Sequence, residues 1–314
     1  MFEIIFLGTS ASAPSVRRGL SAHIVKHNEH RFLIDCGEGT QRQILKSGVG
    51  FKRLNRVLIT HGHLDHILGL AGLFSTFSRW ETLEEVEIMG GKWALERIDA
   101  LLYGVRVIPK GNRSNIKISL RVIEPGVIFE QDGFTVTAFP VSHRGPDCFG
   151  YLFEEPPRRP FLAEKADALG VPHGPIRRDL VQGKKVSLPD GKEIQPEEGM
   201  GDEIAGTKYV HVGDTGRTDD ILAVCQGADA LVIEATYLKT ETEMARDFAH
   251  LTAGQAAQLA KEAGVGQLIL THISRRYRER DVIKEARAVF PNTVVARDFD
   301  MYQVKRGETV KVEG

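Results

Sequence analysis

The feature that most constrains the fold of this 314-residue chain is the run Thr60–His66, in which three histidines and one aspartate fall within six residues. It directly follows residues 56–59, whose apolar side chains predict a buried strand. His61 and His63 are two residues apart, so both project to the same side of an extended segment. Imidazoles paired in this way at a strand end indicate a metal site at the edge of a sheet.

Asp65 and His66 open a segment that is expected to be a helix, because apolar residues follow them at helical spacing. These apolar residues are Ile67, Leu70, Leu73, Phe74 and Phe77. Asp65 and His66 therefore face a point next to the one that His61 and His63 face, as the ligands of a dinuclear metal site do. Alternatively, Asp65 is an ordinary helix N-cap and the histidines are turn residues. One histidine would fit that alternative, but three with an aspartate at this spacing favour metal binding. Imidazole suits zinc, and the mixed ligand set also accepts manganese or iron.

Three further candidate ligands, His143, Asp214 and His272, each lie at the end of a predicted buried strand. Taken singly, each has another explanation, since a histidine at a strand end is often solvated and Asp214 could cap the following helix. Together with the first four they make five histidines and two aspartates. That set is sufficient for two four-coordinate ions if one aspartate bridges them.

These residues, with Asp35, resemble in their order the five motifs of the metallo-β-lactamase superfamily. Within it the chain resembles the ribonuclease Z family, through residues 6–9, 35–43, 213–215, 234–236, 249–253 and 270–277. The resemblance extends over essentially the whole chain, and it implies an endonuclease that removes the 3′ trailer from precursor tRNA. The chain departs from the family pattern at residues 9–12, 18–19 and 69–72, and none of these departures removes a metal ligand.

The resemblance implies an α/β fold, a four-layer αβ/βα sandwich of two mixed β-sheets covered by helices, with the metals on one edge. Residues 1–314 would form a single domain of this fold. The alternation of strands and helices alone predicts only the α/β class. Strands are expected at residues 3–7, 22–26, 31–35, 56–60, 119–140, 150–153, 208–212, 230–234, 267–270 and 294–296. Helices are expected after Asp65, near 92–102, and at 218–226, 253–263 and 280–290, with Thr252 as an N-cap.

Residues 155–206 interrupt this alternation with a proline-rich and glycine-rich insert that carries a basic first half and a predicted hairpin at residues 188–192. In the ribonuclease Z family the equivalent segment is a protruding arm that grips the tRNA body. The candidate contacts in the insert are Arg177, Arg178, Lys184 and Lys185. A surface insertion without a function is the alternative, since long loops cost little free energy, but insertions of this length are more often functional or disordered.

Roles are expected for individual residues from their positions and, for His250, from its match to the family motif. His61, His63 and His143 would hold one ion, Asp65, His66 and His272 the other, and Asp214 both, which gives two Zn²⁺ per subunit with Mn²⁺ or Fe²⁺ as alternatives. Asp65 would also accept the proton of the attacking water, His250 would protonate the leaving 3′-oxygen, and Glu234 would orient His250. Asp35 would steer the histidine rings. Ser274, Arg275, Arg276 and Tyr277 would contact a substrate phosphate or a stacked base. Alternatively, His250 is a residue at the N-terminus of a helix and has no chemical role.

Composition agrees with a cytoplasmic enzyme that does not enter a membrane. The first seven residues carry no basic segment and read as a strand, and no apolar run is long enough to span a bilayer. The three cysteines, Cys36, Cys148 and Cys225, are odd in number and far apart, which is typical of reduced thiols. The formal net charge of −1 argues against a uniformly basic nucleic-acid binder, so RNA contacts must come from local clusters.

Two other classes of function remain open at the level of sequence. One is a hydrolase of the same superfamily that acts on a small substrate, such as a cyclic nucleotide or an aryl phosphodiester. The other is a non-catalytic RNA-binding or scaffold protein, which the intact ligand set disfavours. The resemblance further implies a homodimer in which the arm of one subunit serves the active site of the other.

Overall fold

The computed structural model describes residues 1–80, 83–104 and 116–312. The chain divides into two compact units, one made of Met1–Glu154 with Thr207–Gly314 and the other of Glu155–Gly206. Within the described residues, no helix is both long and apolar enough to cross a bilayer.

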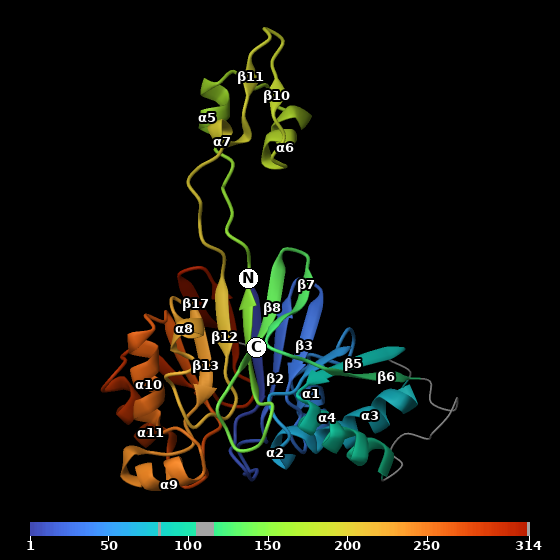
Figure 1. Cartoon of the computed structure of the whole chain (residues 1–314), viewed down its shortest axis with the longest axis vertical. Coiled ribbons are helices and arrows are strands. Elements are labelled where there is room, and N and C mark those ends of the chain that lie inside the picture. The colour runs from blue at the N-terminus through green and yellow to red at the C-terminus, as the bar shows by residue number, and fades with distance from the viewer. Residues whose placement is uncertain (81–82, 105–115, 313–314) are drawn as a thin grey trace. The chain divides into compact units, whose positions relative to one another are not determined.

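The larger unit contains two mixed β-sheets (Figure 1). Among the described residues, the first sheet has the order β17 (Glu308–Val312), β16 (Met301–Lys305), β1 (Phe2–Gly8), β2 (Ala22–His27), β3 (His30–Ile34), β4 (Arg56–Leu58), β5 (Glu85–Gly90) and β6 (Lys117–Val122). The second has the order β15 (Thr293–Val295), β14 (Gln267–Thr271), β13 (Ala230–Glu234), β12 (Lys208–His211), β9 (Phe149–Glu154), β8 (Phe134–Pro140) and β7 (Gly126–Gln131). Strands β3 to β6 and β12 to β15 run parallel, and the remaining pairs are antiparallel.

Strand β1 illustrates how the layers are packed. Its side chains alternate between two faces, as the period of two in a strand requires. Phe2, Ile4 and Phe6 enter a core shared by residues of both sheets, whereas Ile5 and Leu7 enter a core between the first sheet and its helices. Because β1 is buried on both faces, it is apolar along nearly its whole length.

Helices cover the outer face of each sheet, which completes the expected four-layer sandwich. Helices α1 (Thr40–Lys46), α3 (Gly69–Trp80) and α4 (Lys92–Asp99) pack on the first sheet, and α8 (Leu222–Cys225), α10 (Ala253–Glu262) and α11 (Glu279–Arg287) on the second (Figure 1). The predicted cap of α10 is confirmed, because the Thr252 hydroxyl accepts a hydrogen bond from the N–H of Gln255.

The helix expected at residues 218–226 is shorter than predicted and includes only Leu222–Cys225. The physical reason lies just before it. The Thr215 hydroxyl bonds the carbonyl of Arg217, and the Arg217 side chain pairs with Asp219, so this stretch of chain is held in turns.

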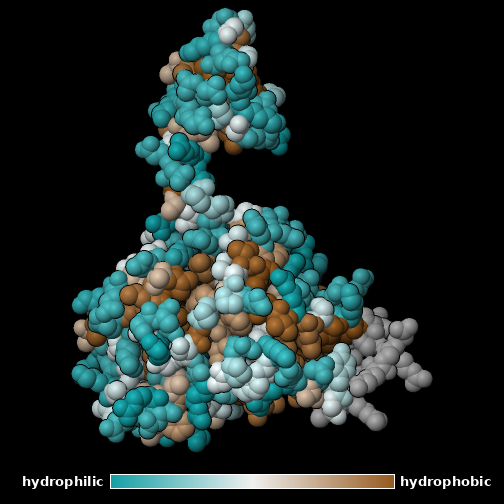
Figure 2. Space-filling model, in the orientation of Figure 1, coloured by the Kyte–Doolittle hydropathy of each residue, from teal (hydrophilic) through white to brown (hydrophobic). Residues whose placement is uncertain are grey.

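The smaller unit has its own core. Its elements are α5 (Ala163–Ala168), α6 (Pro175–Val181), β10 (Val186–Ser187), β11 (Glu193–Ile194) and α7 (Pro196–Gly199). Its buried side chains are Ala166, Val171, Leu180, Val186, Leu188 and Ile194. The predicted hairpin is present, because β10 and β11 pair antiparallel around Gly191, whose φ of 84° suits glycine. The surface of this unit in Figure 2 is mostly hydrophilic.

Candidate metal centre and active site

The histidine run begins where β4 ends, and Asp35 fixes its first residue. The N–H and the hydroxyl of Thr60 donate to Asp35 Oδ1 and Oδ2, each at 2.8 Å. The Thr60 hydroxyl also lies 3.0 Å from His61 Nδ1. The Nε2 of His61 is therefore left to face the site. Asp35 acts as the resemblance implied, on ring orientation rather than as a ligand.

His66 is held by the same carboxylate on the other side. Its Nδ1 lies 2.7 Å from Asp35 Oδ2, which leaves Nε2 pointing into the site. The short helix α2 (Leu64–Ile67) reaches this position because two glycines let backbones approach closely. A Cβ on Gly69 would lie 2.0 Å from the carbonyl oxygen of Gly37, and one on Gly37 would lie 2.4 Å from that of Asp65. Larger residues at these positions would displace the ligands.

Four of the predicted ligands form a first group, made of His61, His63, His143 and Asp214. The Nδ1 of His63 lies 2.9 Å from His61 Nε2 and 3.3 Å from His143 Nε2. Asp214 Oδ2 lies 3.7 Å from the Nε2 of His61 and 3.8 Å from that of His143. His143 is oriented by its Nδ1, which lies 2.7 Å from the carbonyl oxygen of Ala249. The three imidazoles and one carboxylate suit a single tetrahedral ion.

The second group consists of Asp65, His66 and His272, and Asp214 lies beside it. His272 Nε2 lies 3.5 Å from Asp65 Oδ2 and 3.3 Å from Asp214 Oδ1. His66 Nε2 lies 3.4 Å from Asp214 Oδ2. Ligands placed 2.0–2.2 Å from a tetrahedral zinc are roughly 3.4 Å apart, so these spacings match a shared ion.

Several ligand atoms of this site lack hydrogen-bond partners among the described residues, as expected of atoms that bind a cation. The Nε2 atoms of His66 and His272 and Oδ1 of Asp214 are buried and have no hydrogen-bond partner within the described part of the chain. Unsatisfied buried polar atoms are costly unless something binds them. Burial lowers the pKa of His66, yet the carboxylates of Asp214 and Asp35 outweigh burial and raise this pKa well above its usual value. The carboxylates around His66 therefore favour a positive charge beside its imidazole.

Glu234, at the end of β13, organises the opposite side of the centre. It is fully buried. Its Oε1 lies 2.8 Å from His250 Nδ1 and accepts the N–H of Thr215, also at 2.8 Å. Its Oε2 accepts the Thr236 hydroxyl at 2.5 Å, and that hydroxyl lies 2.8 Å from His272 Nδ1. One carboxylate thus orients His250 directly and His272 through a threonine.

Electrostatics distinguishes Asp65 from His250. Burial by itself would raise the pKa of Asp65, but the imidazoles of His66 and His272 hold it well below its usual range. Asp65 is therefore a carboxylate at neutral pH. Burial lowers the pKa of His250, but the charge of Glu234 and its hydrogen bond outweigh burial and raise the pKa to about 9. His250 also lies near Asp214 and His272, but its Nδ1 lies 2.8 Å from Glu234, which orients the ring as a proton donor requires.

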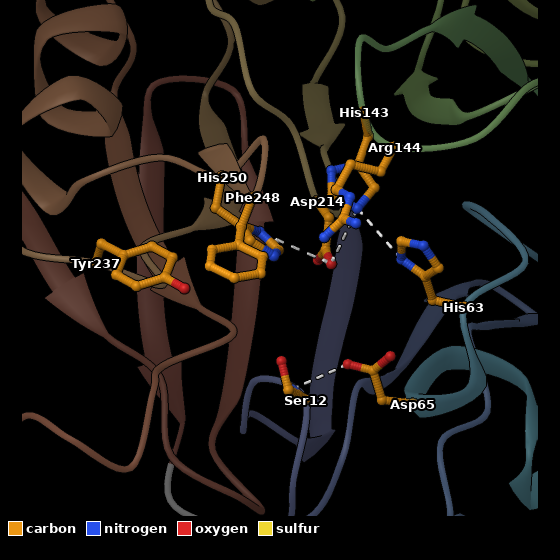
Figure 3. A pocket seen from close by; sticks show the side chains of 9 residues that line it. All are labelled: Ser12, His63, Asp65, His143, Arg144, Asp214, Tyr237, Phe248 and His250. Atoms are coloured by element: carbon orange, nitrogen blue, oxygen red, sulfur yellow. Dashed lines mark hydrogen bonds and ion pairs between the residues drawn. The ribbon is translucent and has the colours of Figure 1, made fainter. Parts of the chain in front are cut away.

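A pocket of about 310 Å³ opens over this centre (Figure 3). Besides predicted site residues, it is lined by Ser12, Arg144, Tyr237 and Phe248. Sequence reasoning missed these four. The Ser12 N–H donates to Asp65 Oδ2 at 2.9 Å, an interaction made by backbone and therefore without a sequence signal. Arg144 and Phe248 are sequence neighbours of the predicted residues His143 and His250, which is the signal that could have found them.

The run predicted to contact substrate, Ser274 to Tyr277, is not among the described residues that line the pocket. Arg275 and Arg276 are exposed, and Arg276 pairs with Glu241 at 3.0 Å. The Tyr277 side chain packs against the core of the second sheet, and its hydroxyl is buried.

The basic residues of the insert differ in their surroundings. Arg177 is tied to the carboxylate of Asp167 and to the carbonyl of Val171, and its side chain is 11% exposed. Arg178, Lys184 and Lys185 are exposed, and the two lysines pair with acidic side chains of the same unit.

Removal of metal is expected to destabilise the larger unit, since buried carboxylates and imidazoles would lose their shared partner. We expect that chelation lowers the thermal midpoint and that added Zn²⁺ restores it. Stabilisation of about 4 kcal/mol is expected at a Zn²⁺ concentration of roughly 1,000 times Kd. Differential scanning calorimetry with chelator, Zn²⁺ and Mg²⁺ measures this effect. Equal midpoints in all three conditions would contradict a metal centre.

The chain is similar to known proteins over nearly its full length. It is 45% identical over 300 residues to a protein named ribonuclease Z from Bradyrhizobium diazoefficiens, an alignment that covers 96% of this chain and 99% of the relative. It is 46% identical to ribonuclease Z from a Bradyrhizobium species, with 97% and 100% coverage. The profile of a family described as "Beta-lactamase superfamily domain" matches residues 180–273, and one described as "Anti-Pycsar protein Apyc1" matches residues 2–157.

Solved structures agree on the fold. The short form of human tRNase Z superposes with a TM-score of 0.68 at 24% identity, covering 96% of this chain and 99% of the other. A metallo-β-lactamase fold protein from Bacillus subtilis superposes with a TM-score of 0.66 at 18% identity, covering 96% and 98%.

Proposed function

Because the chain belongs to the ribonuclease Z family of the metallo-β-lactamase superfamily, we propose that it is a metal-dependent endoribonuclease that cleaves the 3′ trailer from precursor tRNA. Cleavage leaves a 3′-hydroxyl on the tRNA. The observation that carries the proposal is that the carboxylate of Asp214 lies 3.3–3.8 Å from ligand nitrogens of both groups, beside a His250 that Glu234 orients. We place this activity in the cytoplasm, since the three cysteines are free and buried, as in proteins of a reducing compartment.

The ligand set supports two Zn²⁺ per subunit, with Mn²⁺ or Fe²⁺ as alternatives. His61, His63 and His143 would hold one ion, Asp65, His66 and His272 the other, and Asp214 would bridge them. Two such ions would make a bound water more acidic and would neutralise charge on the phosphodiester.

Two residues of the chain move the protons. Asp65, ionised and oriented by the Ser12 N–H, accepts the proton of the attacking water. His250, protonated and oriented by Glu234, donates its proton to the 3′-oxygen as the P–O bond breaks. In the view of Figure 3 His250 lies to the left of Asp214 and Asp65 below and to its right, so the acid and the base reach the site from different directions.

A precursor tRNA with a labelled trailer tests this function. Purified protein is expected to release the trailer in one cut next to the nucleotide that follows the acceptor stem, and to stop when the metal is chelated. The cut is mapped to the nucleotide on a sequencing gel, together with its end groups. Turnover of a cyclic nucleotide without cleavage of the tRNA would instead favour the small-substrate hydrolase.

Glu234→Gln is expected to move the alkaline limb of the pH–rate profile. In the wild type His250 stays protonated up to a pKa of about 9, so kcat falls as pH rises through this value. Without the Glu234 charge, burial is the largest remaining influence and lowers the pKa of His250. We expect kcat to fall relative to the wild type by a factor that grows as pH rises from about 6 to about 8. Glu243→Gln, on an exposed neighbouring carboxylate, is the control. If the alkaline limb of the pH–rate profile is the same in Glu234→Gln and Glu243→Gln, His250 is not the general acid.

We propose further that residues 155–206 form an arm that binds the tRNA body. The unit has its own buried core, so it can act as a separate module. Its exposed cations, Arg178, Lys184 and Lys185, supply the charge that RNA phosphates attract. Arg177 contributes mainly to the fold of the unit, because its guanidinium is satisfied internally.

Deletion of residues 156–205 separates RNA binding from chemistry. Glu154 and Lys208 are paired directly across β9 and β12, so the remaining Glu155, Gly206 and Thr207 can close a short hairpin. We expect kcat/KM for precursor tRNA to fall about 10²-fold or more, whereas hydrolysis of bis(p-nitrophenyl) phosphate persists, because phosphate contacts supply much of RNA affinity. Equal retention of both activities would contradict the arm's role.

Exposed apolar side chains on two neighbouring helices of the sequence, α1 and α2, are candidates for a homodimer contact. Leu45 on α1 is 51% exposed, and Leu64 and Leu68 at α2 are 49% and 37% exposed. We propose that a second copy covers them. Sedimentation is expected to give a dimer for the wild type and a monomer for Leu45→Glu/Leu68→Glu. A monomeric wild type at assay concentration would contradict this proposal.

A further inference from the structure

The pocket over the metal centre has two chemically different sides. His63 and Asp65 lie on one side of Asp214, and Tyr237 and Phe248 lie on the other, next to His250 (Figure 3). The first side consists of predicted ligands. The second offers aromatic rings, to which the chemistry described above gives no role.

Phe248 is exposed, yet its backbone is held firmly. The residue is 45% exposed. Its N–H donates to the carbonyl of Met244, and the N–H of His250 donates to that of Ala245. Between them Ala249 has a φ of 54°, a left-handed conformation that is costly for a residue with a side chain. Its carbonyl accepts the bond from His143 described above. The Phe248 ring is therefore presented from a rigid segment that also carries His250.

A positive charge lies against this ring. The guanidinium of Arg144 is 5.5 Å from the centroid of Phe248, within the range of a cation–π contact. Arg144 directly follows the predicted ligand His143 and lines the same pocket. A flat apolar surface beside a cation is the combination that binds a nucleotide, since the ring stacks on the base and the cation attracts its phosphate.

A single exposed phenylalanine on a protein surface normally needs no explanation. Phe248 differs in three respects, namely its place in the pocket wall, its strained neighbour and its cationic partner. Its position also selects one nucleotide. His250 is proposed to protonate the 3′-oxygen that leaves, so the nucleoside that carries this oxygen lies on the His250 side of the pocket.

We propose that Phe248 stacks on the base of the nucleotide whose 3′-oxygen is released, the last nucleotide of the trimmed tRNA, and that Arg144 binds the 5′-phosphate of that nucleotide. Stacking accepts any base, because every base has a flat face. The pair therefore places the cut by holding one unpaired nucleotide without selecting its identity. This inference rests on the proposed function.

The direct test uses trimmed tRNA, which is not a substrate, with 2-aminopurine as its 3′-terminal base. Stacking on an aromatic ring quenches this fluorophore. We expect quenching by metal-loaded wild type and by Phe248→Trp, and its loss in Phe248→Ala, with binding about 5-fold to 100-fold weaker, the range for one stacked base. Arg144→Gln is expected to weaken binding and to reduce its dependence on salt.

A second experiment combines Phe248→Ala with a precursor that lacks only this base. If Phe248 acts on the base, the two losses of kcat/KM do not add, and the metal content of the variant stays at the wild-type level. Equal quenching by wild type and Phe248→Ala, additive losses, or quenching only at the first trailer nucleotide of a precursor would each overturn the inference. Failure of the wild type to cut precursor tRNA would instead overturn the proposed function, since the fluorescence test needs no cleavage.

Discussion

Asp214→Asn is expected to lower kcat for precursor tRNA by about 10³-fold or more, because loss of a metal site removes several kcal/mol of transition-state stabilisation. Asp214 approaches both ligand groups, with Oδ2 near His61 and His143 and Oδ1 near His272. An amide keeps its shape but loses the negative charge that faces the imidazoles. It is also a poor bridging ligand. We expect the metal content to fall together with kcat.

The control for this variant is Asp219→Asn, five residues along the chain. Asp219 is exposed and pairs only with the neighbouring Arg217 among the contacts described here. It is expected to leave both kcat and metal content unchanged, while circular dichroism reports the fold of both variants. Retention of two ions and of at least a tenth of the wild-type rate by Asp214→Asn would contradict the bridging role.

His250→Ala is expected to lower kcat by about 10²-fold to 10⁴-fold, the usual contribution of a positioned acid. KM and metal content should change little, since His250 Nδ1 is bound to Glu234 rather than left for a metal. The loss should appear only when the leaving group needs a proton. With sulfur in place of the 3′-oxygen at the cleavage site, the leaving thiolate is stable and the variant should approach the wild-type rate.

This sulfur substrate separates the role of a proton donor from a structural role. A variant that merely disturbed the pocket would be slow on both substrates. Equal losses on oxygen and sulfur would therefore contradict His250 as the acid. A lowered metal content in the same variant would instead make His250 a ligand, as its nearness to Asp214 and His272 allows.

Sequence reasoning succeeded where the pattern is local. The predicted helix after the histidine run is present, and Ile67, Leu70, Leu73, Phe74 and Phe77 are all buried in the core that it shares with the first sheet. Three strands were missed, β5, β16 and β17. In β17 the burial pattern is exposed or half-buried throughout, so its sequence lacks the alternation that marks a half-buried strand. In β5, by contrast, Glu85 and Glu87 alternate with the buried Val86 and Ile88, so the strand signal was present in the sequence.

The ligands could be predicted because metal binding demands particular side chains at strand ends. The pocket wall could not, because its contributions depend on the fold. Ser12 acts through a backbone N–H in a left-handed conformation, with a φ of 55°. Phe248 reaches the pocket because Ala249 turns the chain in the same rare conformation. Neither conformation is signalled by a glycine, so no pattern in the sequence indicated them.

The central claim is that side chains from distant parts of the chain hold two cations around Asp214. A crystal of Zn²⁺-loaded protein, with anomalous scattering measured across the zinc edge, tests it most directly. Two peaks are expected, one among His61, His63 and His143 and the other among Asp65, His66 and His272, with Asp214 between them and His250 outside both shells. A single peak, a peak bound by His250, or none would contradict the account.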